Sequence, residues 1–273
     1  MSVIVKAEHL CCQSGRRYLV HDVNWEINKG DRWIVFGVNG SGKTTLLSTI
    51  AGFKNHTSGC LEVFGETYSE DNVFDLRKRI GWVSSSFFDK YFTRESALDI
   101  VLGGVSGTLG VRGCVTDQDV VRAKALLRQF RLGDRVNQPF SLMSKGERQC
   151  VLIARALISD PDVLILDEPG TGLDIYAREF TLQAIADLAE STDITIIYVT
   201  HYAEEILPMF DKTLLLRNGS VYAKGATKDV FTTETMNDFL GCPAHVDWNA
   251  DSVSISVEAL GSYRDASVKM GVW

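Results

Sequence analysis

The stretch that decides the fold runs from Gly37 to Thr45 and reads Gly-Val-Asn-Gly-Ser-Gly-Lys-Thr-Thr. It matches the phosphate-binding loop pattern G-x-x-x-x-G-K-S/T. Its glycines let the backbone approach a polyphosphate with the N–H groups turned inward, because a residue without Cβ reaches conformations closed to others. The Lys43 ammonium is expected to reach the outer phosphates, and the Thr44 hydroxyl to bind Mg²⁺. The residues predicted to bind a nucleoside triphosphate are Gly37, Val38, Asn39, Gly40, Ser41, Gly42, Lys43, Thr44 and Thr45.

The residues on either side of this loop support the same interpretation. Arg32 to Phe36 is a short apolar run typical of a buried strand, and residues 44–53 carry Leu46, Leu47 and Ile50 at helical spacing. The loop is therefore expected to lead from a strand to a helix N-terminus, whose partial positive charge favours an anion. An ordinary glycine-rich turn is the alternative, and the strand-loop-helix order argues against it.

A second motif lies at Val163 to Glu168, where four apolar residues end in two carboxylates. This is the pattern of a central parallel strand that is buried on both faces and ends at the edge where ligands bind. Asp167 is expected to hold Mg²⁺, and Glu168 to polarise the water that attacks the terminal phosphate. A strand that merely ends in surface acids is the alternative. Because a phosphate-binding loop lies earlier in the chain, we favour the roles of metal ligand for Asp167 and of general base for Glu168.

Composition excludes several classes of protein. The chain has 273 residues and a formal net charge of −7, which argues against a surface that coats nucleic acid. The N-terminus lacks the order of a secretory signal, and no apolar run reaches the roughly 18 residues of a membrane span, so we expect a cytoplasmic protein. The six cysteines show no C-x-x-C pair and are expected to be reduced.

Further short runs predict the order of elements along the chain. Strands are expected at residues 59–64, 80–83 and 194–199, and the helical pattern is strongest between residues 88 and 160. Asn218-Gly219 predicts a tight hairpin between two late strands. Leu76 to Arg79 reads as charged surface. Strands that alternate with helices imply an α/β fold with a parallel sheet.

Between the two motifs, residues 142–149 read Leu-Met-Ser-Lys-Gly-Glu-Arg-Gln. With this stretch the chain resembles the ATP-binding subunits of ABC (ATP-binding cassette) transporters, whose signature Leu-Ser-Gly-Gly-Gln corresponds to Met143 to Glu147. Asp167-Glu168-Pro169 and Gly172-Leu173-Asp174 resemble the family's Walker B end and D-loop. His201, which follows a predicted strand, corresponds to its switch histidine. The resemblance spans roughly residues 3 to 240.

The resemblance implies a P-loop ATPase core with a small antiparallel β subdomain and an inserted helical subdomain. The first part of the core is expected at residues 1–87, the helical subdomain at 88–160 and the second part of the core at 161–240. Residues 241–273 extend past the usual end of the cassette. The alternation at 253–257 predicts a short additional β element there.

The resemblance also implies how the site is completed. Ser144, Gly146 and Asp174 would contact ATP bound to a second cassette, so a homodimer, or a heterodimer with another cassette, would enclose ATP and Mg²⁺. A serine that opens a helix also serves as a simple N-cap, which is the alternative for Ser144. His201 would contact the γ-phosphate and hold Glu168 in place. A structural hydrogen-bonding role is the alternative for His201.

The chain departs from the family pattern at three points. The glutamine of the Q-loop is missing from the stretch after Ile80 to Val83, and Ser85 is nearest to its position. The aromatic residue that stacks on adenine is absent near residues 12–15, where Tyr18 is the nearest ring. Lys145 replaces the first glycine of the signature. Coupling through the Q-loop and selectivity for adenine are therefore open questions.

Two classes of function remain open at this stage. The first is the energy-coupling subunit of a transporter, in which ATP-driven closure of the dimer moves integral membrane permease subunits at the inner face of the membrane. The second is a stand-alone cytosolic ATPase that acts on a soluble target or in regulation. The stretches at residues 82–86 and 200–207 resemble a ModF-like subgroup, named for a molybdenum-transport ATP-binding protein. This similarity does not identify the cargo.

Overall fold

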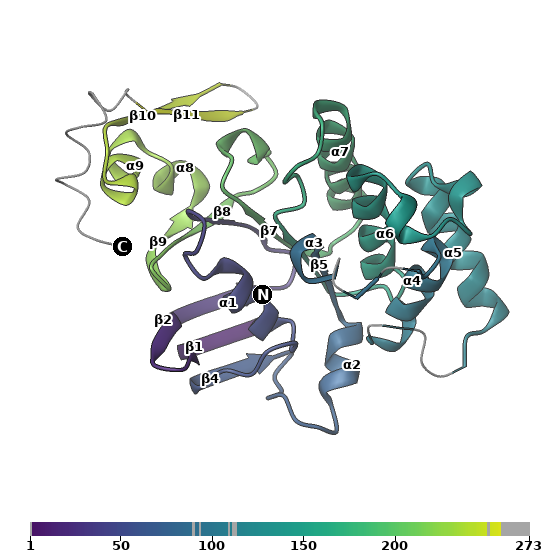
Figure 1. Ribbon diagram of the computed structural model, residues 1–273. Helices are drawn as coiled ribbons and strands as arrows, with labels where there is room; N and C mark the ends of the chain where they lie inside the picture. Colours follow the sequence, from purple (N-terminus) through teal and green to yellow (C-terminus); the bar gives the residue numbers. More distant parts are fainter. Residues whose placement is uncertain are drawn as a thin grey trace.

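The computed structural model describes residues 2–88, 91–92, 94–108, 110, 114–249 and 252–257. Within them, the centre of the molecule is a six-stranded sheet in the order β5-β6-β7-β3-β8-β9 (Figure 1). Its strands are β3 (Arg32–Phe36), β5 (Ile80–Ser84), β6 (Val163–Asp167), β7 (Thr195–Thr200), β8 (Lys212–Arg217) and β9 (Ser220–Ala226). All neighbours are parallel except β8 and β9. The predicted parallel α/β sheet is confirmed.

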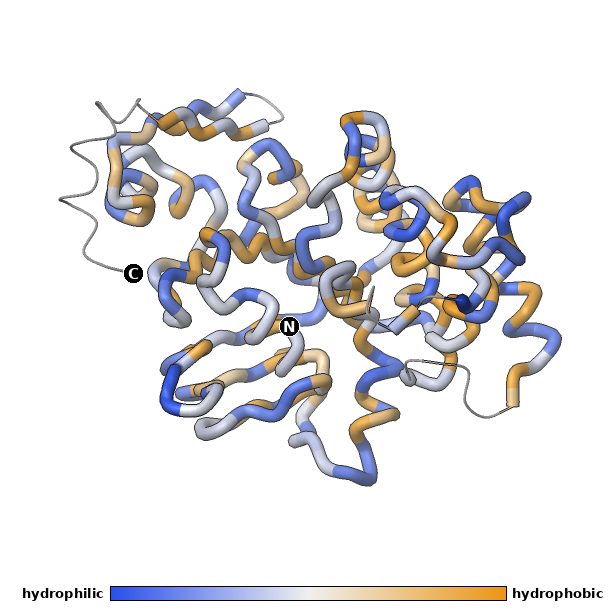
Figure 2. Tube along the Cα trace, in the orientation of Figure 1, coloured by the Kyte–Doolittle hydropathy of each residue, from blue (hydrophilic) through white to orange (hydrophobic). Residues whose placement is uncertain are grey.

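Strands β5, β6 and β7 are mainly apolar because both faces of the sheet are covered there. Every residue of β5, β6 and β7 is buried. A parallel sheet with helices on both faces requires continuous apolar strands rather than alternating ones. Figure 2 shows the apolar colour concentrated along these strands, while polar residues lie mainly on the outer loops and helices. The carboxyl end of β3, which leads into the phosphate loop, is therefore held by a rigid core.

A second, antiparallel sheet lies beside the first. Its order is β2-β1-β4, with β1 (Val3–Ser14), β2 (Arg17–Asn28) and β4 (Ser58–Val63). Helix α1 (Lys43–Ile50) contacts β1 and β2 on one side and β6 on the other. The helix that follows the phosphate loop is thus clamped between the two sheets (Figure 1).

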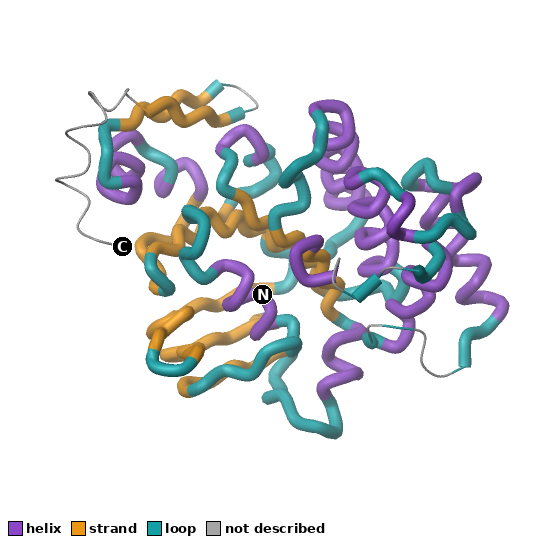
Figure 3. The backbone as a smooth tube through the Cα atoms, viewed as in Figure 1, coloured by secondary structure: helices purple, strands orange, loops and turns teal. Residues whose placement is uncertain are grey.

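A helical lobe extends from one side of the central sheet, as Figure 3 shows. Its elements are α3 (Ser85–Phe88), α4 (Ala97–Gly103), η1 (Gly104–Ser106), α5 (Asp117–Gln129), η2 (Gly133–Arg135), η3 (Phe140–Leu142) and α6 (Lys145–Leu157). α4, α5 and α6 each begin with a capping box, at Ser96, Thr116 and Ser144. Aromatic rings of Phe53, Trp82, Phe87 and Phe88 pack at the base of the lobe. α6 also packs on β5 and therefore joins the lobe to the core.

Helix α7 (Ile175–Ser191) and η4 (Ala203–Glu205) flank β7, and the chain then forms the predicted hairpin of β8 and β9. Asn218 and Gly219 both have positive φ, as a two-residue turn with matching twist requires. α8 (Thr227–Val230) and α9 (Thr233–Leu240) follow. β10 (Ala244–Trp248) pairs with β11 (Val253–Val257), which confirms the expected late β element. The rest of the predicted extension, residues 258–273, lies outside the described residues.

One surface prediction is wrong. Leu76 to Arg79 is not simply charged surface, because α2 (Val73–Lys78) forms there and buries Leu76. The Arg77 guanidinium lies over the Phe53 ring and donates to the Gly52 carbonyl. A long side chain can bury its stem and pair its charged end locally, which a count of charges does not reveal. Within the described part of the chain, no helix combines the length and apolar character that a membrane span requires.

Candidate functional site

The carboxyl ends of the parallel strands meet at one edge and place the predicted residues together. The strand register puts Ser84 opposite Asp167, and Phe36, which precedes the loop, opposite Thr200. A cleft of about 850 Å³ opens there. Its lining residues are Arg17, Tyr18, Leu19, Asn39, Gly40, Ser41, Gly42, Lys43, Thr44, Thr45, Ser85, Ser86, Lys145, Arg148, Gln149, Asp167, Glu168, Thr171, Leu173, Asn218 and Gly219.

The phosphate loop has the shape that the sequence predicts. Gly40 and Gly42 have φ of +80° and +102°, in the left-handed region that favours glycine. A Cβ on Gly42 would lie 2.3 Å from the Leu19 carbonyl oxygen, so this position excludes any side chain. Helix α1 begins directly after Gly42, with no side chain capping its first turn. Its free N–H groups can therefore bind an anion.

Lys43 is almost fully buried and faces the phosphate loop. Its Nζ donates to the carbonyl oxygens of Gly37 at 2.8 Å and Val38 at 3.1 Å. The same atom lies 3.3 Å from Glu168 Oε1. The two carbonyls hold the Lys43 ammonium in the cleft, where a phosphate oxygen can join its partners.

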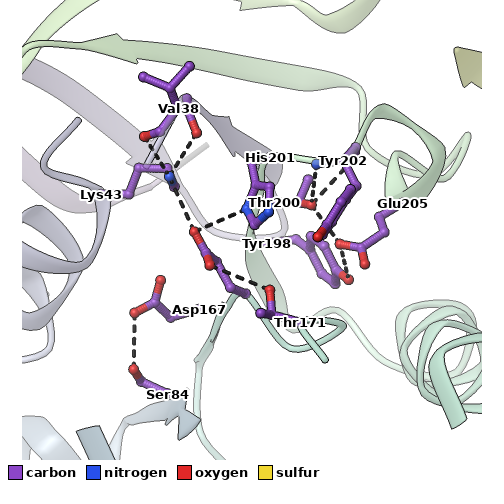
Figure 4. Close-up of polar contacts among 12 residues, drawn as sticks. Val38, Lys43, Ser84, Asp167, Thr171, Tyr198, Thr200, His201, Tyr202 and Glu205 are labelled. Atoms are coloured by element: carbon purple, nitrogen blue, oxygen red, sulfur yellow. Dashed lines mark hydrogen bonds and ion pairs between the residues drawn. The ribbon is translucent and has the colours of Figure 1, made fainter. Parts of the chain in front are cut away.

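Asp167 lies at the bottom of the cleft with 4% of its surface exposed. Burial raises the pKa of its carboxyl to about 6, while the hydroxyls of Thr44 and Ser84 and the charge of Lys43 act in the opposite direction. Ser84 Oγ donates to Oδ2 at 3.1 Å (Figure 4). Oδ1 has no hydrogen-bond partner among the described residues. A buried carboxylate oxygen left free beside a hydroxyl suits Mg²⁺, which prefers oxygen ligands.

Glu168 occupies the centre of the polar contacts. Its φ of +51° turns the side chain away from the strand direction toward the cleft. Oε1 lies 3.4 Å from His201 Nδ1, and Thr171 Oγ1 donates to Oε2 at 3.5 Å. The structure thus brings Lys43, Glu168 and His201 together, from the loop and from the ends of two neighbouring strands.

A buried network behind His201 was not predicted from the sequence. Thr200 Oγ1 donates to Glu205 Oε2 at 2.6 Å and accepts from the Tyr202 N–H at 2.9 Å. The Tyr198 hydroxyl donates to the same oxygen of Glu205 at 3.1 Å (Figure 4). Burial raises the pKa of the Glu205 carboxyl. These bonds fix the loop that carries His201; the only hint in the sequence is an acid four residues after the histidine.

Ser144 caps the helix that carries the signature. Its Oγ accepts from the Glu147 N–H at 3.3 Å, and Glu147 Oε2 accepts from the Ser144 N–H at 2.8 Å. Asp174 caps α7 in the same way by accepting from the Ala177 N–H at 2.8 Å. The simpler alternative for Ser144, an N-cap, is therefore present in this chain. Ser144, Gly146 and Asp174 do not line the cleft that contains the phosphate loop.

The structure shows what surrounds Tyr18 and Ser85, at two of the points where the chain departs from the family pattern. Tyr18 lines the cleft beside the phosphate loop with 47% of its surface exposed, and its ring forms a T-shaped pair with the His21 ring, with 4.7 Å between the ring centroids. Ser85 also lines the cleft, and its Oγ donates to Gln149 Oε1 at 2.6 Å. Sequence reasoning missed Gln149, because no local pattern shows that a residue of α6 meets the end of β5.

Comparison with known proteins identifies the family. The model of the ABC transporter family matches residues 20–171. The chain belongs to this family. It is an ATP-binding and ATP-hydrolysing ABC transporter subunit.

Two relatives show the extent of the similarity. This chain is 36% identical over 251 residues to the uncharacterized ABC transporter ATP-binding protein YlmA of Bacillus subtilis. The match covers 91% of this chain and 95% of YlmA. The chain is 32% identical to the ABC transporter ATP-binding protein ModF of Escherichia coli, covering 69% of this chain and 39% of ModF. ModF is one of several relatives at this level, so the ABC family is shown and the ModF-like subgroup is not.

Solved structures give the same fold. An ABC transporter described as metal-chelate type, in an inward-facing conformation, matches with a TM-score of 0.75 and 28% identity, over 94% of this chain and 98% of that one. A dimeric ATP-binding cassette in a post-hydrolysis state, bound to ADP and phosphate, matches with a TM-score of 0.72 and 25% identity. That match covers 82% of this chain and 98% of the other.

Proposed function

We propose that the cleft binds MgATP with assigned roles for its residues. The loop N–H groups from Gly40 to Thr45 and the Lys43 ammonium would bind the β- and γ-phosphates. Thr44 and Asp167 would hold Mg²⁺, which supplies charge neutralisation of the phosphates when it is bound. The observation that carries this proposal is the convergence of the buried Lys43 ammonium, the free Asp167 oxygen and the Glu168 carboxylate in one cleft.

Glu168 is the proposed general base. Its carboxylate would accept a proton from the water that attacks the γ-phosphate, and His201 would hold this carboxylate and contact the phosphate. The 3.4 Å separation of Glu168 Oε1 from His201 Nδ1 supports the pairing. Thr200 and Glu205 would keep the histidine loop in place through their 2.6 Å hydrogen bond.

A second copy of the chain, or another cassette, is proposed to complete each site. Ser144, Gly146 and Asp174 lie outside the cleft of their own chain, yet Ser144 and Gly146 stand at the positive end of α6. Near them, Leu142 and Ile175 are 72% and 76% exposed, and the partner would cover these apolar side chains. The dimeric cassette with ADP and phosphate, to which this chain is similar, supports a dimer, and we propose that its two subunits are arranged head to tail.

The proposal also covers the membrane partners of the dimer and the location of the chain in the cell. Integral membrane permease subunits would receive the motion of the dimer, and the chain would lie in the cytoplasm at the inner face of the membrane. The similarity to a chain of an inward-facing ABC transporter supports this arrangement. No observation favours the alternative of a stand-alone ATPase. Membership of the ModF-like subgroup is supported by the 32% identity to ModF, and the domain boundaries at residues 87, 160 and 240 remain part of the proposal.

Two measurements test the proposal. The purified chain should release phosphate from ATP when Mg²⁺ is present and stop when the metal is chelated. The tagged chain, purified from detergent-solubilised membranes of its own cells, should bring down an integral membrane protein. An absence of hydrolysis at any protein concentration would overturn the ATPase site. Hydrolysis without any membrane partner would overturn the permease part alone.

A further inference from the structure

A buried glutamine of the signature helix reaches the ATP cleft. Gln149 lies on α6, exposes 2% of its surface and lines the cleft. Its Oε1 accepts a hydrogen bond of 2.6 Å from Ser85 Oγ. Its Nε2 is buried and has no hydrogen-bond partner among the described residues. Buried amide groups in folded proteins are almost always paired, so this donor requires an explanation.

The serines that surround Ser85 connect this amide with the predicted metal ligand. Ser84 Oγ donates to Asp167 Oδ2 at 3.1 Å and lies 3.2 Å from Ser86 Oγ. Ser85 and Ser86 both line the cleft. The segment of residues 84–86 therefore bonds to Asp167 on one side and to Gln149 on the other. It joins the end of β5 to the helical lobe.

Burial and geometry together point to a ligand for the free donor. Ser85 fixes the amide by its oxygen, which leaves both N–H groups of Nε2 available. The cleft that Gln149 lines also contains Lys43, Thr44 and Glu168, where the proposed function places the terminal phosphate. An amide N–H at this position has an anionic acceptor once ATP is bound, because a phosphate oxygen is a strong acceptor.

We propose that Gln149 donates its Nε2–H to the terminal phosphate of bound ATP and that Ser85 is the positioning residue that aims it. The proposal rests on the proposed function, because it uses the same ATP site. It means that this chain presents its glutamine amide from α6, although Ser85 occupies the segment where a glutamine was expected.

The placement of Gln149 has a consequence for the dimer. Ser144 and Gln149 are five residues apart on α6, which corresponds to roughly 7.5 Å along the helix axis. The helix would therefore contact its own subunit's ATP through Gln149 and present Ser144 to the ATP of the second subunit. Binding at one site would restrict the position of the helix that completes the other.

The first test compares steady-state ATP hydrolysis of the unaltered chain with Gln149→Glu and Gln149→Ala. Gln149→Glu keeps the size and an oxygen for Ser85 but replaces the donor with a charged acceptor, so we expect kcat to fall at least roughly tenfold. Gln149→Ala should lower kcat by a similar factor. Gln183→Ala, an exposed glutamine of α7, is the matched control and should leave kcat and KM unchanged.

A purely structural role would give a different result. If Gln149 only joins α6 to α3, Gln149→Ala lowers the Tm, while kcat stays within about twofold and the rise in Tm on adding ATP is unchanged. That outcome would overturn the proposal. Our account requires the ATP-induced rise in Tm, measured in the non-hydrolysing Glu168→Gln background, to shrink in both Gln149 variants.

The second test is Ser85→Ala, which removes the positioning hydroxyl but leaves Gln149 unchanged. We expect a smaller fall in kcat than for Gln149→Ala, and no further fall when the two changes are combined, because they act through one hydrogen bond. Additive effects would contradict the positioning role of Ser85. A chain that fails to hydrolyse ATP before any substitution would refute the proposed function instead, so the two failures are distinguishable.

Discussion

The Glu168 carboxylate lies 3.3 Å from the Lys43 ammonium, across the cleft from the end of β6 to the phosphate loop. The same oxygen lies 3.4 Å from His201 Nδ1. A phosphate that binds to Lys43 must therefore share this cation with a carboxylate, and the two negative charges repel each other. The acid that is proposed to drive hydrolysis also limits how tightly ATP is held.

Tyr18 is expected to bind the base of the nucleotide. Its ring is about half exposed in the cleft and forms a T-shaped pair with the His21 ring. Because stacking of a base on an aromatic ring contributes about 1–3 kcal/mol, Tyr18→Ala should raise the KM for ATP roughly tenfold with little change in kcat. Steady-state kinetics provide the measurement. Tyr18→Phe keeps the ring and should keep the KM; an unchanged KM in Tyr18→Ala would refute this assignment.

Gly42 and Gly40 form a matched pair in the phosphate loop. Both have positive φ, but a Cβ at Gly42 would meet the Leu19 carbonyl oxygen at 2.3 Å, whereas one at Gly40 meets nothing within 4 Å. Gly42→Ala should therefore abolish ATP binding and lower the free energy of unfolding by more than the roughly 1–2 kcal/mol expected for the left-handed conformation alone in Gly40→Ala. Equilibrium unfolding and ATP titration measure both quantities. Equal losses in the two variants would show that the Leu19 contact is unimportant.

Asp167 should make the Mg²⁺ requirement depend on pH. Burial raises the pKa of its carboxyl to about 6, so a proton occupies the carboxyl increasingly as the pH falls below that value. Mg²⁺ must displace this proton, so the Mg²⁺ concentration for half-maximal hydrolysis should rise by up to roughly tenfold per pH unit below 6 and level off above it. Titrations of Mg²⁺ between pH 5 and 8 test this. A requirement that stays constant from pH 5 to 6 would exclude Asp167 as the ligand that titrates.

Much of the architecture follows from local sequence signals. The loop at Gly37 to Thr45, the strand ending at Asp167 and the hairpin at Asn218-Gly219 were predicted because glycine conformations and apolar runs act over a few residues. Since parallel strands end at one edge, the sequence also predicted that Glu168 and His201 would share a site. The structure brings them to 3.4 Å.

The remaining features depend on contacts between distant segments. The Ser85–Gln149 hydrogen bond joins residues 64 positions apart, and no periodicity reports such a pair. The burial of Glu205 depends on Tyr198 and Thr200, which present their hydroxyls only because β7 and η4 fold back on each other. Leu76 was misjudged because three charged neighbours outweighed one apolar residue in the local pattern. Its burial depends on the packing of α2 beside β5.

The Glu168→Gln variant tests the central claim, that a carboxylate at this position drives hydrolysis in a dimer closed around ATP. The substitution removes the proton acceptor and the charge that competes for Lys43, while it keeps the size of the side chain. The test measures phosphate release by the variant and, by light scattering, the mass of the particle. Both are measured with and without MgATP. The account predicts at least a roughly hundredfold fall in turnover and a stable dimer that forms only with ATP. Turnover within about fivefold of the unaltered chain, or a particle that stays monomeric at saturating ATP, would contradict it.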